Sequence, residues 1–383
     1  MILVLPPRDE YLSRLDARRR SLDALTGADA RLSYFRMAAF AAFAVLLFTG
    51  ARGLTAWSWL APPAVLFFWL VRRHDRLIRA RDQAGRAVLF YQRGLARLDD
   101  AWAGTGEAGE RFTDPDHLYA ADLDLFGTGS LFELLSIART RIGEERLAAW
   151  LKAPASPAVV RERQAAVDEL ASRPDLRERV ALAGADVGAG VESDALTSWA
   201  EEAPQLPHGW MRIAAIALTA AAIAGAVQWA RTGSAGVLIV IVLLELALFM
   251  AHRPRMHRIL HAAGGWSRDL DVLAHVLDQI ERETFSSAPL ASLRARLDAA
   301  GAPPGRAIRH LHRLVEMHDW QHNLLFAIIA TPLLWDVHVA FAMEAWRARY
   351  GRHVRDWLAC VGDFEALSSL ATYRFEHPAD PFP

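Results

Sequence analysis

Two histidines one helical turn apart are the residues best suited to bind a metal ion. His318 and His322 stand at positions i and i+4, so on a helix they would share one face, as the histidines of the H-E-x-x-H zinc motif do. Asp319 occupies the position that this motif gives to glutamate, and the sequence marks no third ligand. The pair is a candidate metal site. The simpler interpretation, which we favour, is two polar-face or partly buried histidines, and we expect no metal.

Glu245 is the second candidate because it interrupts the apolar stretch Thr232–Ala251. A charged side chain inside a bilayer is costly, so an intramembrane carboxyl is a functional candidate by default. A small transporter would pair Glu245 with another ionisable group in the membrane, and the sequence offers no such group. The alternative is a carboxyl that is protonated, faces a neighbouring helix or reaches the interface.

The remaining polar clusters fit no known reactive site. The aspartates between 114 and 124 lack the D-x-D-x-D-G spacing of a calcium loop. Residues 127–130 read as a turn and a helix cap, and not as a nucleophile elbow. A group of arginines is interspersed with glutamates, which favours a solvated surface over a phosphate-binding track; it comprises Arg139, Arg141, Arg146, Arg161 and Arg163.

Composition favours a membrane protein over a nucleic-acid-binding one. Of the 383 residues 53% are hydrophobic, and the net charge is -1. This balance fits a membrane component and gives no global electrostatic case for binding nucleic acid. Cys360 is the single cysteine, which excludes an intrachain disulfide and a cysteine metal cluster.

Four apolar segments occur in two close pairs. A helix needs about 20 apolar residues, within a range of about 17–25, to span a bilayer. The second to fourth segments meet this length, and the first does so if Tyr34 and Phe35 lie at the interface. We predict transmembrane hairpins at residues 31–72 and 207–254, with a kink at Pro62-Pro63. The segments are Met37–Ala51, Gly53–Val71, Ile213–Ala230 and, apart from Glu245, Thr232–Ala251.

Arginines flank the hairpins and are scarce in the turns between their helices. Seven precede the first segment, five lie between residues 72 and 81, and three follow the fourth segment, whereas the turns hold only Arg52 and Arg231. The positive-inside rule therefore predicts a multi-pass protein of the inner (cytoplasmic) membrane. Both turns would lie outside, and the N-terminus and all other parts would be cytoplasmic.

Helical periodicity dominates the rest of the chain. We predict an all-α fold, a helical-bundle core interrupted by the transmembrane hairpins. Residues 1–30 would form a charged helix ending near Gly27, and residues 73–115 an amphipathic connector helix and linker. The core would occupy residues 116–206 and 255–383. Alternating leucines and aspartates predict at most one short strand, near residues 119–126.

An ordered set of motifs opens the core. Ser130 and Glu133 have the capping-box spacing, and Leu131, Leu134, Leu135 and Ala138 would share one helical face. In order and spacing the set resembles the entry to the core (lever) domain of the MutS family, and Trp357–Ala371 resembles the helix by which that domain leads to the ATPase domain. The set comprises Ser130-Leu131, Leu134-Leu135, Thr140, Gly143, Leu147, Trp150-Leu151 and Arg163–Leu170.

The resemblance implies a membrane-anchored MutS-related protein of the DNA mismatch repair family. The second hairpin would take the position of the family's DNA clamp. Full-length relatives bind ATP and Mg²⁺ in an ATPase domain, through which they dimerise, and bind DNA. Lys152, the only lysine, follows no glycine loop, so this chain has no Walker A motif. We expect no catalytic residue, no cofactor and no ATP hydrolysis in this chain, which would end before that domain.

The partners implied are the lipid bilayer, a MutS-like ATPase domain, DNA and a second copy bound through the ATPase domain. DNA is the partner that charge supports least, and the Phe-x-Glu wedge with which the family reads mismatches is absent. The alternative is a non-enzymatic membrane scaffold that binds protein partners and has no role on DNA.

Overall fold

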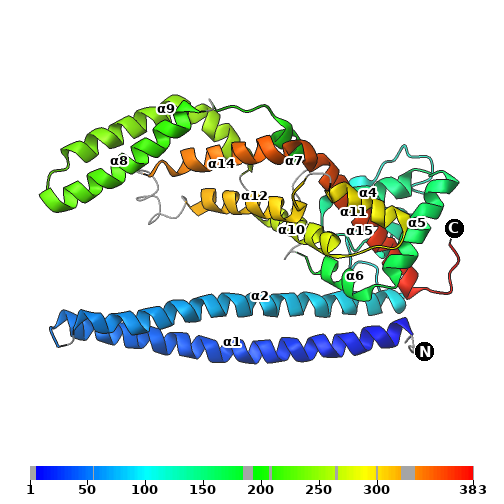
Figure 1. The fold of residues 1–383 in the computed structure, drawn as a ribbon. Coiled ribbons are helices and arrows are strands. Elements are labelled where there is room, and N and C mark those ends of the chain that lie inside the picture. Colours follow the sequence, from blue (N-terminus) through cyan, green and yellow to red (C-terminus); the bar gives the residue numbers. More distant parts are fainter. Residues whose placement is uncertain are drawn as a thin grey trace. The chain divides into compact units, whose positions relative to one another are not determined.

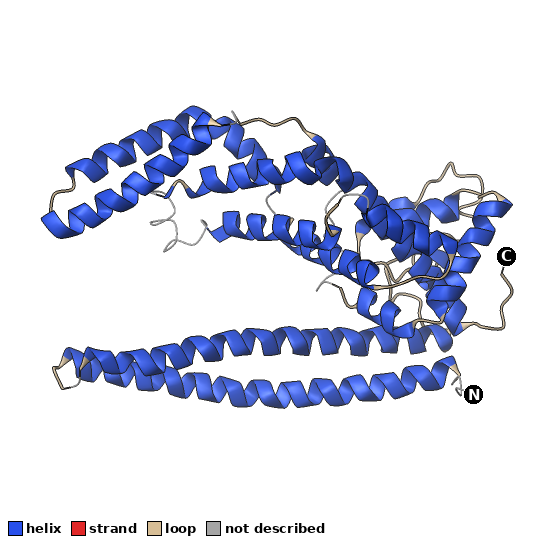
Figure 2. Ribbon diagram, in the orientation of Figure 1, coloured by secondary structure: helices blue, strands red, loops and turns tan. Residues whose placement is uncertain are grey.

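The computed structural model confirms the all-α fold class. Every regular element among the described residues is a helix (Figures 1 and 2). Those residues are 6–54, 56–183, 193–206, 209–263, 266–298, 301–320 and 333–382.

The chain forms two compact units, and each is considered by itself. The first comprises Met1–Ala108, Gly127–Leu134 and Phe375–Pro381. The second comprises Gly109–Phe126, Leu135–Arg374 and Phe382–Pro383.

The first unit is built on a long antiparallel helix pair, α1 (Pro7–Ala51) and α2 (Ala61–Leu98), joined through the 3-10 turn η1 (Trp57–Leu60). Contacts between the two helices follow an antiparallel register, from Arg81 with Asp29 at 2.8 Å to the rings of Phe40 and Phe67 at 6.1 Å. Beyond these contacts, the apolar side chains near the turn are largely exposed.

Helix α1 runs through Gly27 without interruption, so the predicted end near this residue is wrong. A glycine in a helix interior costs only about 1 kcal/mol relative to alanine. Leu32 and Ala39 of α1 pack along α2 and are only 9% and 5% exposed. This packing favours one continuous helix.

The predicted span Gly53–Val71 is not one helix, because α2 begins only at Ala61. Pro62 and Pro63 were predicted to kink a helix from inside it. They instead lie in the first turn of α2 and therefore start the helix. Proline is favoured at this position because the first-turn N–H groups have no partner in the helix.

A buried ion pair lies at the other end of the hairpin. Arg97 Nε and Nη2 donate to Glu376 Oε2 and Oε1 at 2.8 and 2.6 Å. The Tyr11 hydroxyl donates to Glu376 Oε1 at 3.0 Å, and the Tyr11 ring packs edge-on against Tyr91. This polar cluster fixes the register of α1, α2 and the segment that begins at Phe375.

The second unit contains the remaining long helices. It also holds two short 3-10 turns, η2 (Glu110–Phe112) and η5 (Gly351–His353). Its helices are α4 (Arg141–Lys152), α5 (Pro157–Ala171), α6 (Pro174–Ala181), α7 (Ser193–Glu201), α8 (Trp210–Thr232), α9 (Gly236–Ala263), α10 (Ser267–Arg282), α11 (Ala288–Asp298), α12 (Pro304–Asp319), α14 (Trp335–Tyr350) and most of α15 (Val354–Glu376).

Helices α10, α12 and α14 form the centre of this unit. The Trp346 indole N–H donates to Ala307 O at 2.8 Å, and the Trp335 indole N–H donates to Met317 O at 2.6 Å. These two bonds set α14 antiparallel to α12. Because both indoles satisfy their N–H groups on backbone carbonyls, they can be part of the apolar core at little polar cost.

Residues 119–126 do not form the predicted strand and instead form consecutive turns. Leu123 N donates to Tyr119 O and Leu125 N to Ala120 O, and Asp124 has a positive φ of 47°. Leu125 is 2% exposed but Leu123 is 59% exposed, so the alternation does not define one buried face. A single strand among these helices would have no neighbouring strand to pair with its backbone N–H and C=O groups.

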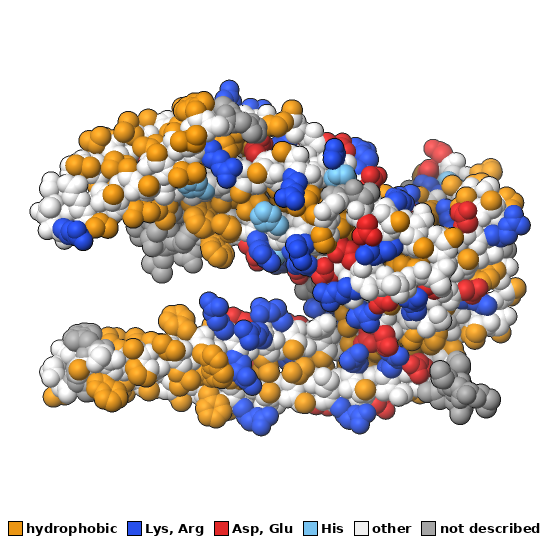
Figure 3. All heavy atoms as spheres, viewed as in Figure 1, with side chains coloured by type: hydrophobic (Ala, Val, Ile, Leu, Met, Phe, Trp, Pro, Cys, Tyr) orange, Lys and Arg blue, Asp and Glu red, His pale blue; other side chains and the backbone are white. Residues whose placement is uncertain are grey.

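Helices α8 and α9 form a hairpin that turns at Gly233, where a φ of 72° suits glycine. At Gly225 an added Cβ would lie 3.4 Å from the Leu238 Cα, so the two helices approach closely there. Hydrophobic side chains cover their outer surface (Figure 3).

Three described helices are long and apolar enough to cross a membrane: Pro7–Ala51, Trp210–Thr232 and Gly236–His261. They contain the first and third predicted segments and the fourth from Gly236 onward. Only 11%, 17% and 6% of their most apolar windows are buried, as expected for helices whose outer face meets lipid.

Candidate functional site

Two of the predicted motif residues, Thr140 and Gly143, lie where α4 meets α15. Thr140 caps α4, and its Oγ1 accepts the N–H of Gly143 at 3.1 Å. The same hydroxyl donates to a carboxylate oxygen of Glu365 on α15. Thr140 and Gly143 therefore act together with Glu365, which the sequence placed in the second matching stretch without giving it a role.

Glu365 is held by backbone as well as side-chain donors. Its oxygens accept the N–H groups of Arg139 at 2.9 Å and Thr140 at 3.2 Å. The residue is 1% exposed, and this burial raises the pKa of its carboxyl to about 7, although the hydrogen bonds from Thr140 and Arg139 oppose the rise. A proton-binding carboxyl thus joins the two halves of the core.

Glycines allow the close approach at this junction. A Cβ at Gly143 would lie 2.2 Å from Glu365 Oε2 and 2.7 Å from its Cβ. On the opposite helix, a Cβ at Gly362 would lie 2.9 Å from the Ile142 side chain. We call this junction, made by Thr140, Gly143, Gly362 and Glu365, the α4–α15 clasp.

Gly143→Ala is expected to destabilise the protein by about 1–3 kcal/mol, the usual cost of overpacking a rigid interior. The matched control is Gly27→Ala, because Gly27 lies inside α1 with nothing within 4 Å of an added Cβ. That change should stabilise by about 0.5–1 kcal/mol. Thermal unfolding of both variants in detergent measures the two effects, and equal shifts would contradict a tight clasp.

Ser130 and Glu133 form a variant of the predicted capping box. Glu133 N donates to Ser130 Oγ at 3.3 Å, whereas the Glu133 carboxylate accepts the N–H groups of Gly129 at 2.8 Å and Gly106 at 2.9 Å. In a standard capping box, the Glu133 carboxylate would accept the backbone N–H of Ser130. Here it accepts two N–H groups of the preceding loops instead.

Helix α3 (Leu131–Leu135) is too short for the predicted inner face. Leu131 is 37% exposed, whereas Phe132 is 0% and Leu135 7% exposed. The helix ends before Ala138, so Leu131 and Ala138 do not share a helical face. Phe132 is the buried residue that the motif did not single out.

His318 is buried and pairs with Asp336, whose Oδ1 lies 3.3 Å from His318 Nδ1. This contact joins α12 to α14. His322, its predicted partner, lies outside the described residues. Within the described ranges no group of three or more metal-ligating side chains is assembled.

Glu245 lies on the face of α9 that is buried in the hairpin, and it is 2% exposed. Neither carboxylate oxygen has a hydrogen-bond partner in the described part of the chain. The approach of Gly225 to Leu238 sets an antiparallel register that brings Thr219 of α8 to the level of Glu245. Thr219 Oγ1 lies 3.1 Å from His338 Nε2 of α14. The carboxyl therefore belongs to the seam where α8, α9 and α14 meet.

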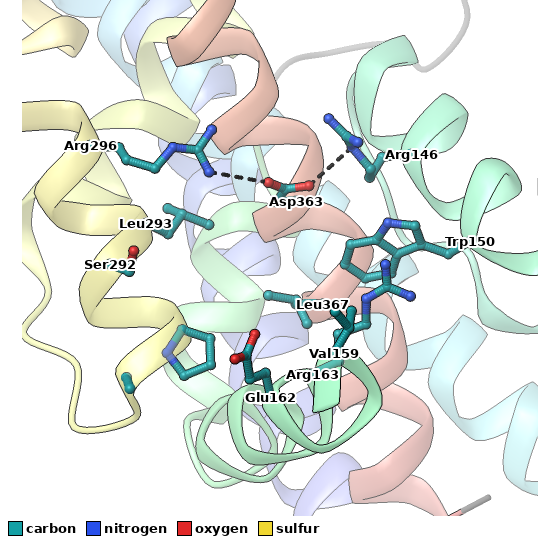
Figure 4. Close-up of a pocket in the computed structure, with 12 residues that line it drawn as sticks. Arg146, Trp150, Val159, Glu162, Arg163, Ser292, Leu293, Arg296, Asp363 and Leu367 are labelled. Carbon is teal, nitrogen blue, oxygen red and sulfur yellow. Dashed lines mark ion pairs between the residues drawn. The ribbon is translucent and has the colours of Figure 1, made fainter. Parts of the chain in front are cut away.

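Trp150 faces a cleft between helices. The Arg163 guanidinium carbon lies 3.8 Å from the centroid of its ring, in cation–π geometry. The cleft around this pair is shown in Figure 4. Two of its arginines, Arg146 and Arg163, were predicted to belong to a solvated surface, and the alternation of charges gave no sign that they would line one cleft.

Comparisons of the chain with protein-family models, with curated proteins and with solved structures found no match.

Proposed function

We propose that this chain is the membrane-anchored core of a MutS-like protein, a helical lever that couples an ATPase domain to a hairpin in the bilayer. One observation carries the proposal. From Leu135 onward, the first stretch that resembles the MutS core lies in the same compact unit as the second, Trp357–Ala371, and the two contact each other through the α4–α15 clasp.

Other contacts support one body interrupted by an inserted hairpin. Glu169 of α5 accepts the N–H groups of Ser286 and Ser287 at 2.9 and 2.7 Å, and Arg177 of α6 donates to Thr372 of α15 at 3.1 Å. Each contact joins a residue before the α8–α9 hairpin to one after it. A hairpin inserted between two interlocked halves is where a lever would receive or deliver movement.

Helix α9 provides the mechanical connection. Its lipid-facing part continues through Pro254, which lies inside the helix, into Met256, Ile259 and Leu260, which are 1%, 1% and 3% exposed in the core. The Trp199 indole donates to Ile259 O at 3.2 Å. A helix that is exposed to lipid at one end and buried at the other transmits a tilt in the bilayer to α7 and the core.

The charge pattern supports turns outside and the core in the cytoplasm. Arg253, Arg255 and Arg258 follow the apolar part of α9, whereas its turn with α8 has Arg231 alone. ATP and Mg²⁺ would be bound by the ATPase domain, and a homodimer would form through that domain.

Single-cysteine labelling tests the membrane arrangement. In a Cys360→Ser background, Ser234→Cys places a thiol in the exposed α8–α9 turn and Leu118→Cys places one on the body, where Leu118 is 90% exposed. We expect a membrane-impermeant maleimide to label Ser234→Cys on intact cells and Leu118→Cys only after lysis. Labelling of both or neither on intact cells would contradict a spanning hairpin, and the reverse pattern would contradict its orientation.

A scaffold without a role on DNA is the second candidate, and the net charge of -1 favours it. Retention of the detergent-purified chain on a DNA column separates the two functions. Binding that weakens steeply with salt supports the DNA-linked form, because each phosphate contact releases counterions. Absence of retention at low salt supports the scaffold.

A further inference from the structure

A cleft of about 500 Å³ opens between α4, α5, α11 and α15 in the second unit (Figure 4). Its volume falls in the range of about 300–1,000 Å³ that small-molecule sites occupy. Its walls combine arginines with an apolar surface that includes Val159, Pro289, Leu293 and Leu367. The cleft adjoins the clasp, because an added Cβ at Gly362 would lie 3.4 Å from the Arg146 Cβ.

Two guanidinium groups pair with one carboxylate in the cleft, and a third lines the cleft on the Trp150 ring. Arg146 lies 3.0 Å and Arg296 3.5 Å from opposite oxygens of Asp363. Arg163 is the third, and it makes no ion pair within the part of the chain that the structure describes. Glu162 lies at the other end of the cleft in Figure 4. The charged residues that line the cleft are thus three arginines and two carboxylates, a surplus of one positive charge.

Arg163 is held in place without a counterion. Its guanidinium stacks on Trp150, which restricts it to the cleft wall. Burial lowers the pKa of the Arg163 guanidinium, and the neighbouring Arg146 lowers it further, while Asp363 opposes both. An anion bound beside Arg163 and Arg146 would relieve this repulsion and supply the missing partner.

We propose that this cleft binds a small organic phosphate, with the phosphate between Arg146 and Arg163 and its apolar portion against Leu293 and Leu367. A phosphate monoester carries about 1.5 to 2 negative charges at neutral pH, so it can pair with Arg163 and share Arg146 with Asp363. Guanidinium forks bind phosphate oxygens in pairs. The site is independent of the proposed lever function and of any ATPase domain.

Isothermal titration of the detergent-purified full chain with phenyl phosphate tests the site. Arg163→Gln is expected to weaken binding about tenfold or more, since a hydrogen bond to a charged group contributes about 1.5–3 kcal/mol. Arg161→Gln is the matched control, because Arg161 is exposed on the same helix and does not line the cleft. Arg163→Lys keeps the charge and should retain part of the affinity.

Two further arms make the test specific. Asp363→Asn removes the carboxylate that competes for Arg146 and Arg296, so it should bind phenyl phosphate more tightly. A merely structural arginine cluster would not gain affinity by this change. Inorganic phosphate should bind more weakly than phenyl phosphate, because it leaves the apolar wall uncovered.

Several results would overturn the site. They are unchanged affinity in Arg163→Gln, an equal loss in Arg161→Gln, and weaker binding in Asp363→Asn while its melting temperature stays that of the wild type. A single-stranded oligonucleotide that binds more tightly than phenyl phosphate and depends on Arg163 would assign the cleft to nucleic acid and overturn the small-molecule ligand.

Discussion

Replacing Glu376 by alanine is expected to lower the free energy of unfolding of the α1–α2 hairpin by about 3–5 kcal/mol, the usual cost of removing one partner of a buried ion pair. Arg97 is 8% exposed and would keep a buried charge with no carboxylate to meet it. The Tyr11 hydroxyl would lose its acceptor as well. Faster hydrogen exchange of the amides at the start of α1 is the measurement.

A second ion pair at the same end of the hairpin provides the control. Arg8 and Asp99 pair across α1 and α2 with side chains 55% and 46% exposed. Asp99→Ala should change stability by no more than about 1 kcal/mol, because solvent screens an exposed pair. The double variant Arg97→Leu, Glu376→Leu should recover most of the loss, since apolar replacement of a buried pair is often neutral. Equal exchange in Glu376→Ala and Asp99→Ala would refute the argument.

Glu365→Gln is expected to remove a pH dependence of stability on the order of 3 kcal/mol. The Glu365 pKa rises from an ordinary 4.5 to about 7 in the folded protein. Between these values the folded state binds a proton that the unfolded chain has released, so stability falls as pH rises. The contribution is complete below pH 4.5 and lost above pH 7.

Melting temperatures from pH 4.5 to 7.5 measure this effect. At about 2–4 °C per kcal/mol for a body of this size, the wild type should lose roughly 6–12 °C more than Glu365→Gln across the window. Glu107→Gln, which removes an exposed carboxyl, should keep the wild-type slope. Parallel curves for Glu365→Gln and the wild type would show that the clasp does not bind the proton.

Local signals in the sequence predicted the helices well. Apolar periodicity predicted the all-α fold class, and the capping-box spacing at Ser130 marks a helix start that its hydroxyl caps. The failures arose where a local pattern depended on packing. The alternating residues near Leu123 have no neighbouring strand with which to pair among the described residues. The packing of α1 on α2 keeps Gly27 inside one continuous helix.

The candidate site was less predictable because it depends on contacts between distant residues. Thr140 and Gly143 were identifiable as motif residues, but their partner Glu365 follows more than 200 positions later. Likewise, Arg146 and Arg163 alternate with glutamates along the chain, and only the crossing of α4, α5, α11 and α15 brings them to one cleft. Residue spacing defines a helix face, and tertiary packing defines what that face meets.

The uncharged part of α1 is short for a hydrocarbon layer of ordinary depth. The uncharged tip of α1, Met37–Ala51, reaches only about 22 Å at 1.5 Å per residue, against a layer of about 30 Å. At this tip the Arg52 guanidinium carbon lies 4.5 Å from the centroid of the Phe48 ring. From there the guanidinium can reach the lipid headgroups at the tip's side of the bilayer. Hydrophobic mismatch around α1 would therefore thin the surrounding lipid or sort the protein into thinner regions.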